Sequence, residues 1–188
     1  MRQGVTKEKV ILSFLEVACE KGTGGASLSD IASALSIKKS SLYNHFESRA
    51  DLVSETTKYC SSFLQTVQFK ALSEECSSLF ELLSSALNRY MQLFEGYPLR
   101  EIFTYVEAGK FYSAEIESIS SFHQERIASE FASLLRMAVS KGFIKSPTIE
   151  KLDIISKTAS IIIHNSLFSK NTSVTISLLL NLLEPYSL

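Results

Sequence analysis

The sequence has no tryptophan, only three cysteines and no long uninterrupted apolar run. Cys19, Cys60 and Cys76 form an odd, widely spaced set without a CxxC pair, which favours a reducing compartment over a disulfide framework. We expect packing roles for them, with redox sensing by Cys60 or Cys76 as the alternative. The most apolar stretch, Val174 to Leu183, is about half the length of a membrane span. Because no apolar signal region lies near residue 1, we predict a cytoplasmic location without membrane contact.

The motifs of common enzymes and metal sites are also absent from the sequence. It contains no G-x-S-x-G, Walker or G-x-G-x-x-G motif, and His45, His123 and His164 lie on separate segments. No histidine follows a glutamate at the E-x-x-H spacing of helical di-iron sites. We therefore predict that the protein is not an enzyme, with no catalytic residue, no metal site and no cofactor.

Apolar residues recur at helical spacing along the chain, and no segment alternates with the period of two typical of a β-strand. The first stripe spans about Thr6 to Lys21 and ends at a glycine-rich segment. Further helices are expected over residues 51–70, 79–94, 116–138, 148–169 and 173–183. With 45% hydrophobic residues, a chain of 188 residues can bury a substantial core. The sequence therefore predicts an all-α fold.

The stretch from Ser27 to Leu52 carries the clearest local signals in the chain. Ser27 can cap a helix, and Asp30, three residues later, completes the pattern of a capping box. The apolar residues of that helix form one stripe, namely Leu28, Ile31, Ala32 and Leu35. Residues 36–38 suffice only for a tight turn before a second helix from Lys39 to Phe46. Two short helices joined in this way form a helix-turn-helix.

The second of these helices has an apolar and a polar face. Leu42 and Phe46 lie one turn apart and are expected to point inward. The rotation of about 100° per residue then points hydroxyl, phenol and amide groups outward, from Ser40, Ser41, Tyr43 and Asn44. Asparagine can bridge adenine in the major groove, and hydroxyls can donate or accept there. Basic residues at the two ends of the helix can meet phosphates, namely Lys38, Lys39 and Arg49.

The run IASALSIKKSSLYNHFESRADL, residues 31–52, resembles the DNA-binding domain of TetR-family transcriptional regulators. The usual pattern of that family is I-A-x-x-x-G-V-S-x-x-x-[LIF]-Y-x-[HY]-F-x-[SN]-K-x-x-L. The resemblance implies a dimeric, ligand-responsive regulator in which residues 39–45 form the recognition helix, with Tyr43 and Arg49 at positions that commonly touch phosphate. The candidate DNA-binding residues are Ser27, Lys38, Lys39, Ser40, Ser41, Tyr43, Asn44, His45 and Arg49. The alternative is a helical hairpin inside an unrelated all-α protein.

Two residues depart from the family pattern. Ser36 stands where the family usually has glycine, and a left-handed backbone there would cost roughly 1 kcal/mol. Lys38 stands where a capping serine is common, so the recognition helix should lack an N-cap, an effect of about 1 kcal/mol. Phosphate contact by Lys38 can offset the missing cap when DNA binds.

The resemblance divides the chain into a three-helix DNA-binding domain over 1–50 and a helical-bundle effector-binding and dimerisation domain over 51–188. A helix from Asp51 would connect the two. Aromatic residues gather in the middle helices, where the resemblance places the effector pocket, and aromatic walls suit a flat or apolar small molecule. The candidate pocket residues are Phe63, Tyr90, Phe94, Phe103, Tyr105, Tyr112 and Phe122. The alternative for each is an ordinary core position.

The last two expected helices are apolar on more than one face, which is more than a single core can easily use. In the family the C-terminal helices pair into a four-helix dimer interface. The candidate interface residues are Ile155, Ile162, Phe168, Ile176, Leu179, Leu180 and Leu183. Burial of these helices within a monomer is the alternative.

These expectations combine into a homodimeric repressor that binds near-palindromic double-stranded DNA and is released by a small hydrophobic or aromatic effector. The first 55 residues carry seven basic and seven acidic side chains, which cancel, so we expect weak non-specific binding and a modest salt dependence. The zero net charge of the DNA-binding module, the residue Ser36 and the missing cap at Lys38 leave one alternative function open. In that alternative the chain is a helical small-molecule or protein-binding dimer that no longer recognises an operator.

Overall fold

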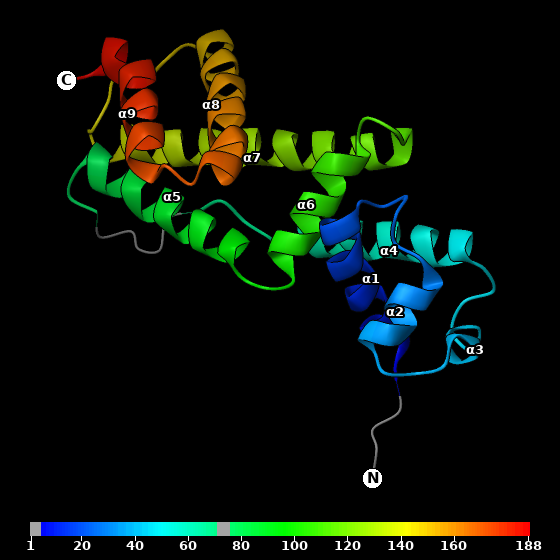
Figure 1. Ribbon diagram of the computed structural model, residues 1–188. Helices are drawn as coiled ribbons and strands as arrows, with labels where there is room; N and C mark the ends of the chain where they lie inside the picture. Colours follow the sequence, from blue (N-terminus) through cyan, green and yellow to red (C-terminus); the bar gives the residue numbers. More distant parts are fainter. Residues whose placement is uncertain (1–4, 71–75) are drawn as a thin grey trace. The chain divides into compact units, whose positions relative to one another are not determined.

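The computed structural model describes residues 5–70 and 76–188, and these ranges contain α-helices and no β-strand (Figure 1). The predicted all-α fold is confirmed. Ile144 and Ser187 form an isolated antiparallel bridge. The helices are α1 (Lys7–Lys21), α2 (Leu28–Ala34), α3 (Lys39–Leu42), α4 (Arg49–Leu64), α5 (Leu79–Glu95), α6 (Leu99–Gly109), α7 (Ala114–Ser140), α8 (Ile149–Ser169) and α9 (Thr172–Leu183), followed by the 3₁₀ turn η1 (Glu184–Tyr186). Across the described ranges, no helix is both long and apolar enough to cross a membrane.

The chain divides into two compact units. The first unit comprises Met1–Thr66 and Tyr97–Ser120, and the second comprises Val67–Gly96 and Ser121–Leu188. The first unit extends past residue 50, the predicted end of the DNA-binding domain, because α4 and α6 both pack against α1. This is a division by packing, and the boundary between the two functional domains stays a prediction.

The first unit is built on α1, which has about the predicted span and ends at the predicted glycine-rich segment. The Thr6 hydroxyl accepts a hydrogen bond from the Lys9 amide at 3.2 Å, and Gly22 ends the helix with φ at 76°. Helix α1 packs on α2 and α4, and α2 packs on α3. The buried apolar side chains of these helices and of the turn after α3 include Phe14, Leu15, Ile31, Leu42, Phe46 and Leu52. Helix α4 was predicted to reach about residue 70, which is wrong. It ends at Leu64, where the Thr66 hydroxyl donates to the Phe63 carbonyl at 2.7 Å and the chain turns.

The second unit combines α5, most of α7, α8 and α9. Ser78 caps α5 and Thr148 caps α8, each through a side-chain oxygen that accepts a backbone amide. Its core contains a group of aromatic rings in which Phe69 lies 5.3 Å from Tyr90 and 6.2 Å from Phe131, centroid to centroid. Helices α8 and α9 pack on each other and on α5.

Candidate nucleic-acid interface

The start of α2 is fixed by the predicted capping box. The Ser27 hydroxyl accepts from the Asp30 amide at 3.1 Å, and the Asp30 carboxylate accepts from the Ser27 amide at 3.0 Å. Lys21 donates to the other carboxylate oxygen at 2.6 Å. The hydrogen bonds from Lys21 and then Ser27 hold the pKa of Asp30 well below its usual range. Ser27 is exposed, but its hydroxyl is occupied within the protein.

The turn after α2 has the hydrogen bonds of a Schellman motif. The Ile37 amide donates to the Ala32 carbonyl at 2.9 Å, and the Ser36 amide donates to the Ser33 carbonyl at 3.0 Å. This geometry requires a left-handed residue at position 36, and Ser36 has φ at 55°. The left-handed backbone that the family pattern places at a glycine is therefore present here at Ser36.

Helix α3 is shorter than the sequence predicts, since it ends at Leu42 rather than Phe46. Beyond Leu42 the chain continues in turns, because the amides of His45 and Phe46 both donate to the Leu42 carbonyl, at 2.9 and 3.1 Å. The expected absence of an N-cap is confirmed, because no side-chain hydrogen bond from Lys38 caps the helix.

The predicted two faces of this segment are confirmed by burial. Leu42 and Phe46 are buried at 2% and 4% exposure, while Tyr43 is 52% exposed. Ser41 and His45 are half-buried. The exposed candidates are Lys38, Lys39, Ser40, Tyr43 and Asn44. The structure thus brings most of the candidate DNA-binding side chains together at the surface of one short segment.

Arg49 has a role that the sequence did not reveal. Its Nε donates to the Ala26 carbonyl at 3.2 Å, and its Nη2 donates to the Thr23 carbonyl at 2.5 Å. Arg49 therefore ties the loop between α1 and α2 to the first turn of α4. A phosphate contact would have to share a guanidinium that already holds this loop. The only sequence feature that points to this role is the glycine-rich loop, because its backbone carbonyls lie outside a helix and need donors from elsewhere.

The seven aromatic residues expected to line an effector pocket are divided between the two units. Tyr90, Phe94 and Phe122 lie in the second unit, while Phe63, Phe103, Tyr105 and Tyr112 lie in the first. Tyr112 is 91% exposed, whereas Tyr90 and Tyr105 are core residues at 1% and 2%. The Tyr90 hydroxyl lies 2.7 Å from Nε2 of His123, and the Tyr105 hydroxyl lies 3.4 Å from that of Thr57. These side chains do not gather in one unit.

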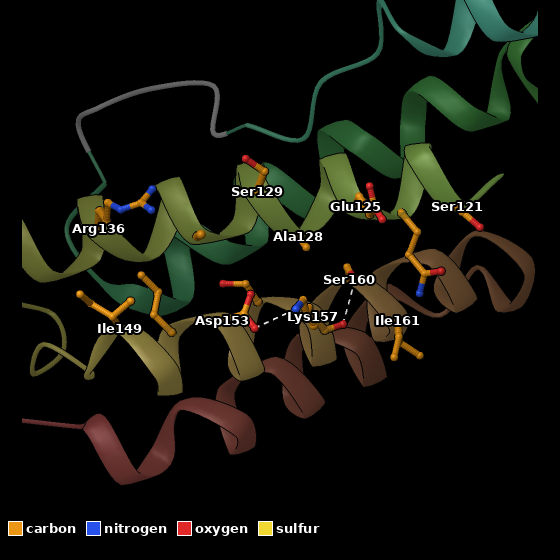
Figure 2. A pocket seen from close by; sticks show the side chains of 14 residues that line it. Ser121, Glu125, Ala128, Ser129, Arg136, Ile149, Asp153, Lys157, Ser160 and Ile161 are labelled. Atoms are coloured by element: carbon orange, nitrogen blue, oxygen red, sulfur yellow. Dashed lines mark hydrogen bonds and ion pairs between the residues drawn. The ribbon is translucent and has the colours of Figure 1, made fainter. Parts of the chain in front are cut away.

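A groove of about 740 Å³ lies instead between α7 and α8 in the second unit, and none of the seven aromatic residues lines it. Figure 2 shows Glu125 and Arg136 of α7 on one side of the groove and Asp153 and Lys157 of α8 on the other. Within α8, Nζ of Lys157 lies 2.8 Å from Oδ2 of Asp153 and forms an ion pair with it. Ser156 also lines the groove, and its buried hydroxyl has no hydrogen-bond partner in the described part of the chain. No pattern in the sequence marks this groove.

Four of the predicted dimer-interface residues are buried within the chain, namely Ile155, Ile176, Leu179 and Leu183. Ile162 and Leu180 are half-buried, and Phe168 is 57% exposed. The apolar side chains that remain exposed form a different set. Ile154, Ile161 and Phe168 of α8 lie seven residues apart, and α9 adds Val174 and Leu178. We call these five residues the α8–α9 stripe.

The fold and this segment define an all-helical protein with a helix-turn-helix module. The sequence profile of the bacterial regulatory proteins of the tetR family matches residues 15–56, which contain α2, the turn, α3 and the start of α4. Over this segment the chain is similar to the TetR family. This is a family of transcriptional regulators, not of enzymes.

Relatives and solved structures agree with this assignment. The biofilm operon icaADBC HTH-type negative transcriptional regulator IcaR of Staphylococcus aureus (strain Newman) is 30% identical over 95 residues, covering 47% of this chain and 51% of the relative. The IcaR of Staphylococcus epidermidis is 26% identical over 94 residues, with the same coverage. The matches therefore span about half the length of these curated relatives.

Among solved structures, a TetR-family regulator from Marinobacter aquaeolei VT8 gives a TM-score of 0.68 at 18% identity, covering 98% of this chain and 92% of that one. The regulator PfmR from Thermus thermophilus gives 0.64 at 19% identity, covering 93% and 97%. At these identities the likeness shows a shared fold.

Proposed function

We propose that this chain is a cytoplasmic transcriptional repressor that binds a near-palindromic DNA operator as a homodimer and is released by a small-molecule effector. The observation that carries the proposal is the surface of the α3 segment. Its side chains offer an amide and hydroxyls for base edges, and lysines for phosphates, from a segment whose opposite face is fixed in the core. Repression is proposed because the similar IcaR proteins are negative regulators.

Each exposed residue takes a role that suits its chemistry. Asn44 is the candidate for direct base contact, since an asparagine amide can bond two positions of adenine. Lys38 and Lys39 lie at the start of α3 and are the candidates for phosphate contacts, which fix position without reading sequence. Ser40 and Tyr43 are exposed beside them and can bond either bases or phosphates.

Dimerisation is assigned to the α8–α9 stripe. Large apolar side chains that recur every seventh residue on one helix suit packing against another helix. Ile154, Ile161 and Phe168 are each more than half exposed in the single chain, so a second copy would remove much apolar surface from water. A symmetric pair would present two α3 segments to successive major grooves.

For the effector we propose a site in the second unit that takes a small apolar or aromatic molecule. The α7–α8 groove supports this, because Ile149, Leu152 and Ile161 give it apolar walls. An effector that prefers one conformer lowers operator affinity only in proportion to that preference.

The test is selection of a binding site from a randomised duplex library, followed by comparison of Asn44→Ala with Asn88→Ala. Asn88 is an exposed asparagine on α5 and serves as the matched control. We expect a two-fold symmetric site, for which Asn44→Ala loses about 1–3 kcal/mol of binding free energy while its affinity for random DNA is unchanged. Asn88→Ala should bind both as the parent does.

Two results would contradict the proposal. Enrichment of no sequence at about 50 mM salt, where phosphate contacts are strongest, would favour the dimer without operator function. Equal losses by Asn44→Ala on cognate and random DNA would remove Asn44 from base recognition.

A further inference from the structure

The α7–α8 groove, where the effector site is proposed, is long and has aliphatic walls. Its apolar side chains are those of Ala128 and Ala132 of α7 and of Ile149, Leu152 and Ile161 of α8. No aromatic side chain of the described ranges lines it. A flat ring would therefore find no partner to stack on, whereas an alkyl chain needs only apolar contact.

The length of the groove can be measured along α8. Ile149 and Ile161 belong to the same helix, so at about 1.5 Å per residue their backbones lie about 18 Å apart. Figure 2 shows the two side chains toward opposite ends of the groove. Ile149 is 89% exposed and Ile161 is 51% exposed. An extended ligand that touches both would remove more apolar surface from water than a compact one.

The charges that line the groove are unevenly partnered. Lys157 donates to the Asp153 carboxylate at 2.8 Å. That hydrogen bond and the charge of Asp153, and more weakly the charge of Glu125, raise the pKa of Lys157, so two acids share this cation. Arg136 has only the Ser133 hydroxyl, to which its Nη1 donates at 3.4 Å, and it joins no ion pair with any described residue. The exposed guanidinium of Arg136 is therefore open to an anion.

Arg136 lies at the end of the groove where α8 begins. Figure 2 shows it at the same end as Ile149, which is the first residue of α8. The N-terminus of a helix carries a partial positive charge, which adds to that of the guanidinium. Glu150 in the same turn is exposed and does not line the groove. This end of the groove thus favours a negative group, and the rest favours an apolar chain.

We propose that the α7–α8 groove binds a linear aliphatic monocarboxylate, with its carboxylate on the Arg136 guanidinium and its chain extended toward Ile161. A guanidinium and a carboxylate match in shape and can form two parallel hydrogen bonds. The inference rests on the proposed effector site and names the class of molecule that the site takes. Ile161 also belongs to the α8–α9 stripe, so a chain that reaches it touches the proposed dimer interface. That contact gives the ligand a physical means of preferring one dimer geometry over another.

The test uses the full chain without DNA and three probes with the same eight-carbon chain, namely octanoate, 1-octanol and octylammonium. Calorimetry at fixed pH and salt should show saturable binding of octanoate, weaker binding of octanol and the weakest of octylammonium. Arg136→Met keeps an apolar side chain and removes the charge, so it should weaken octanoate binding by roughly tenfold or more and leave octanol binding unchanged. Lys151→Met removes an exposed cation of α8 that does not line the groove, and it should bind octanoate as the parent does.

Ile149→Asp provides a second, independent variant. Ile149 is exposed, so the fold should be kept, and the new carboxylate would repel that of the ligand. We expect octanoate binding to weaken several-fold and octanol binding to change less. Undiminished octanoate binding by both Arg136→Met and Ile149→Asp, or no octanoate binding at millimolar concentration, would overturn the proposal. Octanol binding as tight as that of octanoate would overturn it as well.

Release of operator DNA separates this inference from the proposed function. If octanoate binds through Arg136 but leaves operator affinity unchanged, the carboxylate site stands and its role as the effector site fails. If octanol releases the operator equally well from the parent and from Arg136→Met, while octanoate releases neither, an apolar effector site stands and the carboxylate class is refuted.

Discussion

Replacing Ser36 with glycine should stabilise this protein, because Ser36 occupies the left-handed position that ends α2. Its φ is 55°, and the two hydrogen bonds of the Schellman motif, from the amides of Ser36 and Ile37, hold it there. The Ser36 side chain is exposed, so its removal leaves no cavity. The substitution therefore changes the backbone preference and little else.

The magnitude follows from two opposing terms. A left-handed conformation costs an L-residue roughly 1–2 kcal/mol, which glycine avoids. Glycine in turn loses about 0.5–1 kcal/mol more backbone entropy on folding. The difference leaves a gain of about 0.7 kcal/mol in the free energy of unfolding. For a chain of this length that corresponds to an increase of about 2 °C in Tm.

Denaturant unfolding at fixed protein concentration measures this gain, with Ser36→Ala as the matched control. Alanine also lacks the hydroxyl but keeps the Cβ, so Ser36→Ala should show no gain. The midpoint of Ser36→Gly should rise at unchanged m-value. If glycine were no better than alanine, backbone strain at this turn would be refuted. Lys170, which ends α8 with φ at 52°, offers a second site for the same comparison.

Three other substitutions test separate parts of the structure. Lys38→Ser should raise the free energy of unfolding by about 0.5–1 kcal/mol by capping α3, yet weaken DNA binding in a filter assay if Lys38 contacts phosphate. Arg49→Ala should lower the free energy of unfolding by about 1–2 kcal/mol, measured with denaturant, because two carbonyls of the α1–α2 loop lose their donor. Ile161→Ser in the α8–α9 stripe should halve the mass measured by light scattering, whereas Tyr112→Ser, at an exposed residue of the first unit, should not. A mass unaffected by Ile161→Ser would contradict the assigned interface.

Local features of the helix-turn-helix were predictable because short-range rules decide them. The Ser27–Asp30 capping box involves residues three apart. Leu42 and Phe46 are four apart, and the hydrogen bond from the Phe46 amide to the Leu42 carbonyl keeps both on the inner face beyond the end of α3. The missing cap at Lys38 is visible in the residue type itself. In each case the residues that determine the structure are neighbours in the chain.

Features that depend on distant partners were not predictable. Arg49 lies 23 residues from Ala26, so no local pattern shows that its guanidinium holds that carbonyl. The aromatic residues carry no mark of which unit they join, and the predicted effector set is split between both. Helices α8 and α9 are apolar on several faces, so the sequence could not say that Ile155 faces the core and Ile154 faces solvent.

The net charge of the first 55 residues does not describe the local charge at the start of α3. The first 55 residues are neutral in total, but two of the acids pair with lysines outside the α3 segment, since Glu55 pairs with Lys7 and Lys58, and Asp30 pairs with Lys21. The two pairings of Glu55, that with Lys58 first, lower the pKa of its carboxyl to about 2. In the described ranges, neither Lys38 nor Lys39 forms an ion pair, so the start of α3 keeps its local positive charge.

Local charge of this kind gives a specific expectation for salt dependence. If Lys38 and Lys39 each neutralise one phosphate, log K should fall against log salt with a slope of about −1.8 per module and about −3.6 per dimer. Titrations of operator binding between about 50 and 200 mM salt measure this slope, and loss of both lysines should bring it close to zero. A slope steeper than about −6 would show that other cations meet the backbone. A flat slope with tight binding would show that Lys38 and Lys39 do not contact phosphate.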